Sequence, residues 1–101
     1  MYFAAAMCVY AAAATVHAGT IHAHFDCDGG KSIEATFDNG AKPGVRLSLS
    51  DGRRLVLPQA LSASGARYAN ADESTVFWNK GDTAFVEENG ATTYQGCVAK
   101  H

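Results

Sequence analysis

The chain has 101 residues, of which 48% are hydrophobic and only 18% carry a charge. Eight Lys and Arg stand against ten Asp and Glu, which gives a net charge of −2 with His neutral. This balance is not basic enough for a nucleic-acid-binding protein, and no polybasic stretch marks a membrane surface. We therefore expect a partner to be recognised by local shape and local charge.

The first eighteen residues, "MYFAAAMCVYAAAATVHA", have the features of a secretory signal peptide. A short apolar run rich in Ala ends at Val16-His17-Ala18, with small residues where a signal peptidase cuts. The run is too short to span a bilayer. We predict a signal peptide over residues 1–18 and one mature domain over residues 19–101, with a buried N-terminal helix as the alternative.

Cys8 lies inside this apolar run and raises the alternative of a lipoprotein, in which a lipidated Cys becomes the first mature residue. Met7 is larger than the very small residue that such a site needs just before its Cys. We expect Cys8 to be lost with the signal peptide, and we keep membrane attachment through Cys8 as the second possibility.

Pairs of turn-forming residues recur at nearly even spacing through the rest of the chain, and they suit tight hairpins. Between them lie short segments in which apolar and polar residues alternate, the period of a half-buried strand. The sequence predicts an all-β domain, a small antiparallel β-barrel of about eight strands in up-and-down order. Pro43 and Pro58 should mark strand ends or edges. The expected strands are 20–27, 32–38, 44–50, 54–58, 66–71, 75–79, 83–88 and 92–98.

Cys27 and Cys97 form an even pair in a chain that we expect to be exported. An oxidising compartment favours a disulfide between them, joining the first and last strands. Closing a loop of about 70 residues stabilises a fold by at most about 4 kcal/mol on the chain-entropy model. Two free thiols or metal ligands are the alternative.

Two short motifs suggest a bound metal or phosphate. His22 and His24 are two apart, so both side chains project from one face of a strand and could share a metal ion. Such a site needs further ligands, and the other His of the mature chain is terminal His101. The "GGKS" segment at 29–32 lacks the upstream Gly of a phosphate-binding loop, because Phe25 stands there. We predict no cofactor and no structural metal, and keep a periplasmic metal-binding module using His22 and His24 as the alternative function.

Ser64 and Lys80 each stand beside a Gly in a predicted turn, and two functions are open to them. A Ser/Lys hydrolase would need a neutral Lys in a desolvated cleft with an oxyanion hole nearby. A domain of about 80 residues filled by its own side chains has little room for that cleft. If their strands are neighbours, the two turns instead form a protruding tip, suited to an acidic cleft of a partner.

The aromatic and basic residues around these turns suit an interface or a core. Alternation prevents both residues of the Arg67-Tyr68 pair, or of the Phe77-Trp78 pair, from facing inward. We expect Tyr68 and one of Phe77 or Trp78 in the core, with the others supporting the loops.

Four segments occur in order along the mature chain: "FDCDGG" at 25–30, "LSASGARY" at 61–68, "FWNKGDTA" at 77–84 and "YQGC" at 94–97. Together they resemble the membrane-bound and periplasmic inhibitors of C-type lysozyme, the MliC/PliC family. The resemblance covers nearly the whole mature chain, and its two central segments are rather specific. It implies a small eight-stranded antiparallel barrel without enzyme activity, located in the periplasm of a Gram-negative bacterium.

The resemblance also implies a partner and a binding site. Ser64 and Lys80 match the inhibitory Ser and Lys of the family, which enter the lysozyme active-site cleft and meet its catalytic carboxylates. Ser62 is a second serine nearby, and the choice of Ser64 rests on its position next to Gly65. The family's disulfide maps onto Cys27 and Cys97. We predict that the lysozyme-binding set consists of Ser64, Gly65, Arg67, Tyr68, Trp78, Lys80, Gly81 and Asp82.

Overall fold

The computed structural model describes residues 19–101, so the predicted signal peptide and Cys8 lie outside the described residues. Each strand pairs antiparallel with the next along the chain, and β1 also pairs with β8, so the sheet closes into a barrel. The prediction of an all-β barrel of about eight strands is confirmed. The elements are β1 (Thr20–Asp26), η1 (Asp28–Gly30), β2 (Ser32–Asp38), β3 (Gly44–Leu49), β4 (Arg54–Ala60), β5 (Ala66–Ala69), β6 (Thr75–Lys80), β7 (Thr83–Glu88) and β8 (Ala91–Lys100).

Alternation along the strands builds the core. In β2, Ile33, Ala35 and Phe37 point inward and are buried, while Glu34 between them is exposed. Phe77 lies at the centre of the core, fully buried, with the rings of Phe25, Phe37 and Tyr68 around it. The other large buried side chains are Val45, Leu47, Leu49, Leu57, Val76, Val86 and Tyr94.

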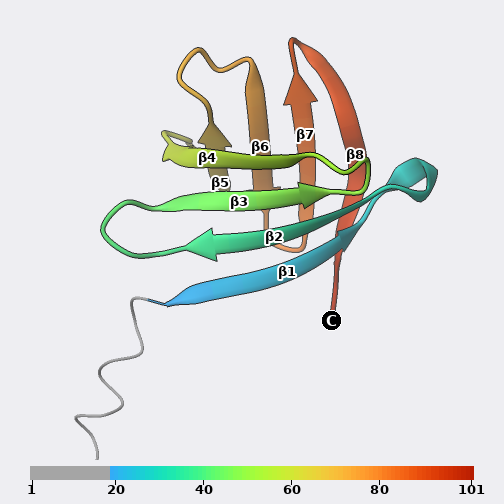
Figure 1. Cartoon of the computed structure of the whole chain (residues 1–101), viewed down its shortest axis with the longest axis horizontal. Helices are drawn as coiled ribbons and strands as arrows, with labels where there is room; N and C mark the ends of the chain where they lie inside the picture. The colour runs from blue at the N-terminus through green and yellow to red at the C-terminus, as the bar shows by residue number, and fades with distance from the viewer. Residues whose placement is uncertain (1–18) are drawn as a thin grey trace, which may run out of the picture.

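The strands form two crossing layers, since β1 to β4 run across the view of Figure 1 and β5 to β8 run up and down behind them. Connections of an up-and-down barrel alternate between its two ends. One end, which we call the site end, holds the β2–β3 loop (39–43), the β4–β5 loop (61–65) and the β6–β7 turn (81–82). The opposite end, the locked end, holds η1 and the connections at 50–53, 70–74 and 89–90.

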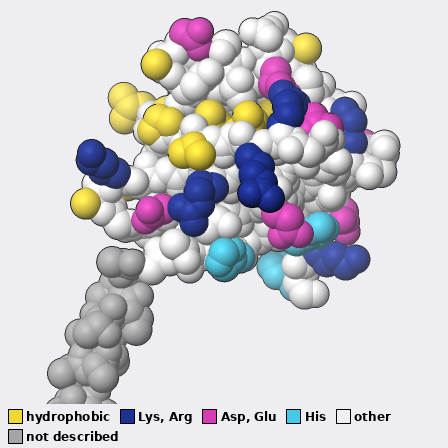
Figure 2. Space-filling view, in the orientation of Figure 1, with side chains coloured by type: hydrophobic (Ala, Val, Ile, Leu, Met, Phe, Trp, Pro, Cys, Tyr) yellow, Lys and Arg dark blue, Asp and Glu magenta, His cyan; other side chains and the backbone are white. Residues whose placement is uncertain are grey.

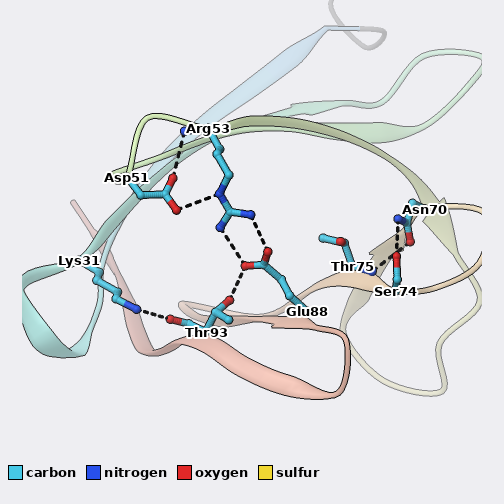
Figure 3. Close-up of polar contacts among 8 residues, drawn as sticks. All are labelled: Lys31, Asp51, Arg53, Asn70, Ser74, Thr75, Glu88 and Thr93. Carbon is cyan, nitrogen blue, oxygen red and sulfur yellow. Dashed lines mark hydrogen bonds and ion pairs between the residues drawn. The ribbon is translucent and has the colours of Figure 1, made fainter.

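Arg53 ties the connections of the locked end together (Figure 3). Its guanidinium donates to both oxygens of Glu88, at 2.6 and 3.0 Å, and to Asp51 Oδ2 at 2.9 Å. Thr93 Oγ1 donates to Glu88 Oε2 at 2.6 Å, and Lys31 Nζ donates to the Thr93 carbonyl at 2.6 Å. The side chain of Glu88 is only 14% exposed, and the hydrogen bonds from Arg53 hold the pKa of its carboxyl below the ordinary value. Charge-assisted bonds therefore join the β3–β4 turn to β7 and β8.

Cys27 and Cys97 form a disulfide across the seam where the barrel closes. Cys27 directly follows β1, and Cys97 lies in β8 next to Val98, which pairs with Asp26. The predicted bridge between the first and last strands is confirmed. It reinforces a short pairing, because β1 and β8 share only three residue pairs, from His24–Lys100 to Asp26–Val98.

Pro58 marks an edge of β4 rather than its end, because the strand continues to Ala60. The Gln59 N–H points toward β3, where it donates to the Pro43 carbonyl at 3.0 Å. The nitrogen of Pro58 therefore faces the other side, where β5 pairs only with Gln59 and Ala60. A proline fits this position because its missing N–H is not needed by the β3–β4 ladder.

Candidate functional site

Ser64 and Lys80 come together at the site end because their strands are neighbours. Ser64 lies in the loop before β5, Lys80 is the last residue of β6, and the two strands pair with Ala66 opposite Asn79. The loop approaches β6 so closely that a Cβ added to Gly65 would lie 2.7 Å from both Lys80 Cγ and the Asn79 carbonyl oxygen. Gly65 also has φ +69°, so both its space and its backbone conformation require glycine.

Trp78 connects the two turns. Its Nε1–H donates to the carbonyl of Ser64 at 3.0 Å, and Lys80 Nζ lies 5.0 Å from the centroid of its ring system. The guanidinium carbon of Arg67 lies 5.8 Å from the same centroid. One half-buried indole thus fixes the loop of Ser64 by a hydrogen bond and holds two cations by cation–π contacts.

The two serines of the β4–β5 loop have different roles. Ser62 Oγ donates to the carbonyl of Ser64 and accepts from the Ser64 N–H at 3.3 Å, so the side chain of Ser62 shapes the loop from within. Ser64 is exposed, and within residues 19–101 its hydroxyl takes part in no hydrogen bond. Of the two, Ser64 has the side chain available to a partner.

The β6–β7 turn is held by bonds that leave the ammonium of Lys80 in solvent. Thr83 Oγ1 donates to the carbonyl of Lys80 at 2.9 Å, while Asn79 Nδ2 donates to the carbonyls of Gly81 and Thr83 at 3.0 Å. The described part of the chain places no carboxylate within ion-pair distance of Lys80 Nζ. The turn therefore presents one exposed positive charge on a braced backbone.

The remaining members of the predicted binding set differ in exposure. Gly81 and Asp82 are exposed in the β6–β7 turn, and Asp82 Oδ1 lies 3.2 Å from His101 Nε2 at the end of the chain. Arg67 is half-buried and pairs with Glu73 as well as with the indole of Trp78.

Tyr68 lies in the core and is only 6% exposed, against rings of Phe37 and Phe77 at centroid distances of 5.7 and 6.1 Å. Burial raises the pKa of its phenol. The expected split between core and surface is confirmed, since Tyr68 and Phe77 are buried while Arg67 and Trp78 are not. Tyr68 thus offers almost no surface to a partner and supports β5 from inside the barrel.

The geometry does not favour a metal site at His22 and His24. The two ring nitrogens of His24 lie within hydrogen-bonding distance of Glu34 Oε2 and Asp26 Oδ1, and these bonds raise the pKa of His24, Glu34 having the larger effect. His22 Nδ1 instead lies 3.0 Å from Thr36 Oγ1. Among residues 19–101, no group of three His, Cys, Asp or Glu is placed to hold a metal ion.

The geometry also does not favour a Ser/Lys hydrolase. Ser64 and Lys80 are both exposed, whereas the hydrolase needs a neutral Lys shielded from water. The site instead presents the exposed hydroxyl of Ser64 and the exposed ammonium of Lys80 on two turns that are joined through Trp78. These groups match the carboxylates of an acidic cleft.

Comparisons with known proteins agree on one family. The family model described as membrane-bound lysozyme inhibitor of c-type lysozyme matches residues 25–95, a range that includes Ser64 and Lys80. The chain is 42% identical over 74 residues to the membrane-bound lysozyme inhibitor of C-type lysozyme of Yersinia enterocolitica, covering 73% of this chain and 59% of that relative. It is 31% identical over 81 residues to the protein of the same name from Cupriavidus necator, covering 75% and 63%. The chain therefore spans about three fifths of the length of these relatives. No solved structure matches it significantly.

Proposed function

The chain belongs to the family of membrane-bound inhibitors of C-type lysozyme, and we propose that it blocks such an enzyme by inserting Ser64 and Lys80 into its active-site cleft. The protein would act as a plug and not as an enzyme. It would stop hydrolysis of peptidoglycan without being consumed, and so protect the cell that exports it.

The observation that carries this proposal is the pairing of two exposed groups on a braced support. The hydroxyl of Ser64 and the ammonium of Lys80 have no hydrogen-bond or ion-pair partner within residues 19–101, and Trp78 contacts both turns. Because the backbone beneath them is already ordered, little conformational entropy would be lost on binding.

The chemistry of the target fits these two groups. A lysozyme cleft holds two carboxyl groups, one acting as the acid and one ionised. The Lys80 ammonium would supply the opposite charge where water is excluded, and the Ser64 hydroxyl could donate to either carboxylate. Burying the Lys80 ammonium and the ionised carboxylate also costs desolvation energy. The net contribution of this ion pair to affinity would therefore be smaller than the Coulomb attraction suggests.

Lysis of a peptidoglycan substrate by a C-type lysozyme, measured with and without residues 19–101, tests the proposal. We expect lysis to stop at a molar excess of the protein, and undiminished lysis at that excess would overturn the proposal.

Lys80→Ala tests the assigned role of the lysine. It should weaken inhibition by about 2–5 kcal/mol, since the cleft carboxylates would face an unfilled gap. Lys31→Ala is the matched control, because Lys31 is also exposed but follows η1 at the locked end. If Lys80→Ala inhibits as well as Lys31→Ala while circular dichroism shows an intact fold, Lys80 does not have this role.

We further propose that the protein is exported to the periplasm after cleavage at Ala18, with lipidation at Cys8 as the alternative. Both relatives are named membrane-bound. Within residues 19–101 the structure contains no helix with the length and hydropathy of a membrane span. The mass of the exported protein separates the two outcomes. A chain beginning at Gly19 supports cleavage at Ala18, whereas a lipid-modified chain beginning at Cys8 would contradict it.

A further inference from the structure

We propose that Leu61 is an apolar anchor of the inhibitor, which packs against the hydrophobic wall of the lysozyme cleft while Ser64 and Lys80 meet its carboxyl groups. The inference rests on the proposed function and adds a contact of a different chemistry to the same site. It assigns a role to a residue that neither the disulfide, the core nor the polar contacts of the barrel explain.

Leu61 is the most exposed large hydrophobic side chain among residues 19–101, at 94% of its free surface. It follows the last residue of β4 and begins the loop that carries Ser64. Hydrophobic side chains also gather along β4 on the face shown in Figure 2. A leucine side chain that stays in water adds no hydrophobic stabilisation to the fold. Its apolar surface remains available for burial by a partner.

Leu61 shares its surroundings with the residues that shape the site. Together with Ser62, Gly65 and Arg67 it lines one depression of the surface. Ser62 is bonded to Ser64, and Gly65 packs against Lys80. A partner that encloses Ser64 and Lys80 therefore meets Leu61 on the same loop.

The chemistry of a lysozyme cleft provides a matching surface. The pKa of its acid is raised to about 6 because the carboxyl group lies in a hydrophobic pocket. The cleft thus has an apolar wall close to its carboxyl groups. In the inhibitor, the β4–β5 loop carries Leu61 together with Ser64. Burial of the leucine would offset part of the desolvation of Lys80.

Binding kinetics of Leu61→Ala on an immobilised C-type lysozyme test the inference. We expect the dissociation constant to rise about tenfold or more, almost entirely through faster dissociation. The salt dependence of association should stay as in the wild type, because no charge is removed. Leu61→Met keeps an apolar side chain of similar volume and should restore binding to within about threefold of the wild type.

Val56→Ala is the matched control, because Val56 is also an exposed apolar residue, at 74%. It lies five residues earlier in β4, about 17 Å along the strand, and its truncation should leave the dissociation constant unchanged. Leu61→Ala binding like the wild type, or Val56→Ala weakening binding equally, would overturn the role of Leu61. The proposed function would stand in both cases, because it is tested by lysis with the wild-type protein and by Lys80→Ala, and not by these two variants. Urea unfolding checks that the variants keep wild-type stability.

Discussion

At the locked end of the barrel, Arg53 reaches from the β3–β4 turn to Glu88 at the end of β7, and Thr93 of β8 completes the contact. At the site end, Trp78 and the turn residues bond to backbone carbonyls, and the polar ends of Ser64 and Lys80 extend into solvent. Both ends are built from hairpin turns of similar length. At the locked end, Arg53 and Glu88 bond to each other. At the site end, hydrogen bonds hold the backbone and the ammonium of Lys80 stays in solvent.

This difference separates stability from recognition. Changes at the locked end should lower the free energy of unfolding without altering the affinity of the folded protein for lysozyme. Changes at the site end should alter affinity, with a loss of stability only where the backbone is strained. Three sets of variants test the separation.

Replacing both Cys27 and Cys97 by Ser should have the largest effect on stability. The bridge spans 70 residues of sequence, and its loss should reduce the free energy of unfolding by about 4 kcal/mol. Urea titration of the double variant, with the reduced wild type as a second reference, measures this. A reduction below about 1 kcal/mol would show that the β1–β8 seam holds without the bridge.

Gly65→Ala should affect both properties. The new methyl group would meet the Asn79 carbonyl and force φ +69° on a residue that disfavours it, so we expect a loss of about 2–3 kcal/mol of stability. Ser64 would be displaced from Lys80, and inhibition by the folded fraction should fall.

Gly90→Ala at the locked end is the matched control for Gly65→Ala. Gly90 has φ +85° with nothing within 4 Å of the added Cβ, so it should lose only about 1 kcal/mol of stability and keep full inhibition. Equal inhibition by the two variants would show that inhibition does not depend on the close fit of the β4–β5 loop against β6.

Arg53→Ala should have a small effect, about 1 kcal/mol of stability at pH 7, because its side chain is nearly half exposed. Arg54→Ala, next to it and exposed, should lose less. Inhibition should be unchanged in both variants.

The effect of Arg53→Ala should depend on pH. The bonds from Arg53 depress the pKa of Glu88 in the folded state, so their contribution is present above the ordinary Glu pKa of about 4.3 and is lost as the pH falls through the depressed value. Urea titrations at pH 7 and pH 2.5 should therefore show the difference between wild type and variant shrinking in acid. A difference that stays constant would exclude Glu88 as the group responsible.

The fold could be predicted from the sequence because each strand carries its own alternation and its own turn signals. Val45, Leu47 and Leu49 of β3 are buried as their spacing indicates. Pro58 shows the limit of local reasoning. Its place inside β4 depends on which side of the strand pairs with β5, and this is set by the register of the whole sheet.

The candidate site was predictable only in part. Ser64 and Lys80 could be identified by their turns and by family resemblance, but their proximity depends on the pairing of β5 with β6. The bond from Trp78 to the Ser64 carbonyl and the packing of Gly65 against Lys80 arise from side-chain direction across two strands. The Arg53–Glu88 pair joins residues 35 apart in sequence, a separation at which no local pattern gives a signal.

Competition for the lysozyme cleft is the sharpest test of whether Ser64 and Lys80 enter it. A short oligomer of N-acetylglucosamine, a sugar of the enzyme's own substrate, would occupy the cleft, and the affinity of residues 19–101 for lysozyme would be measured as its concentration rises. If Ser64 and Lys80 enter the cleft, the apparent dissociation constant should increase in proportion to the oligomer once the cleft is saturated. An affinity that does not change with oligomer concentration would place the inhibitor elsewhere on the enzyme and contradict the account.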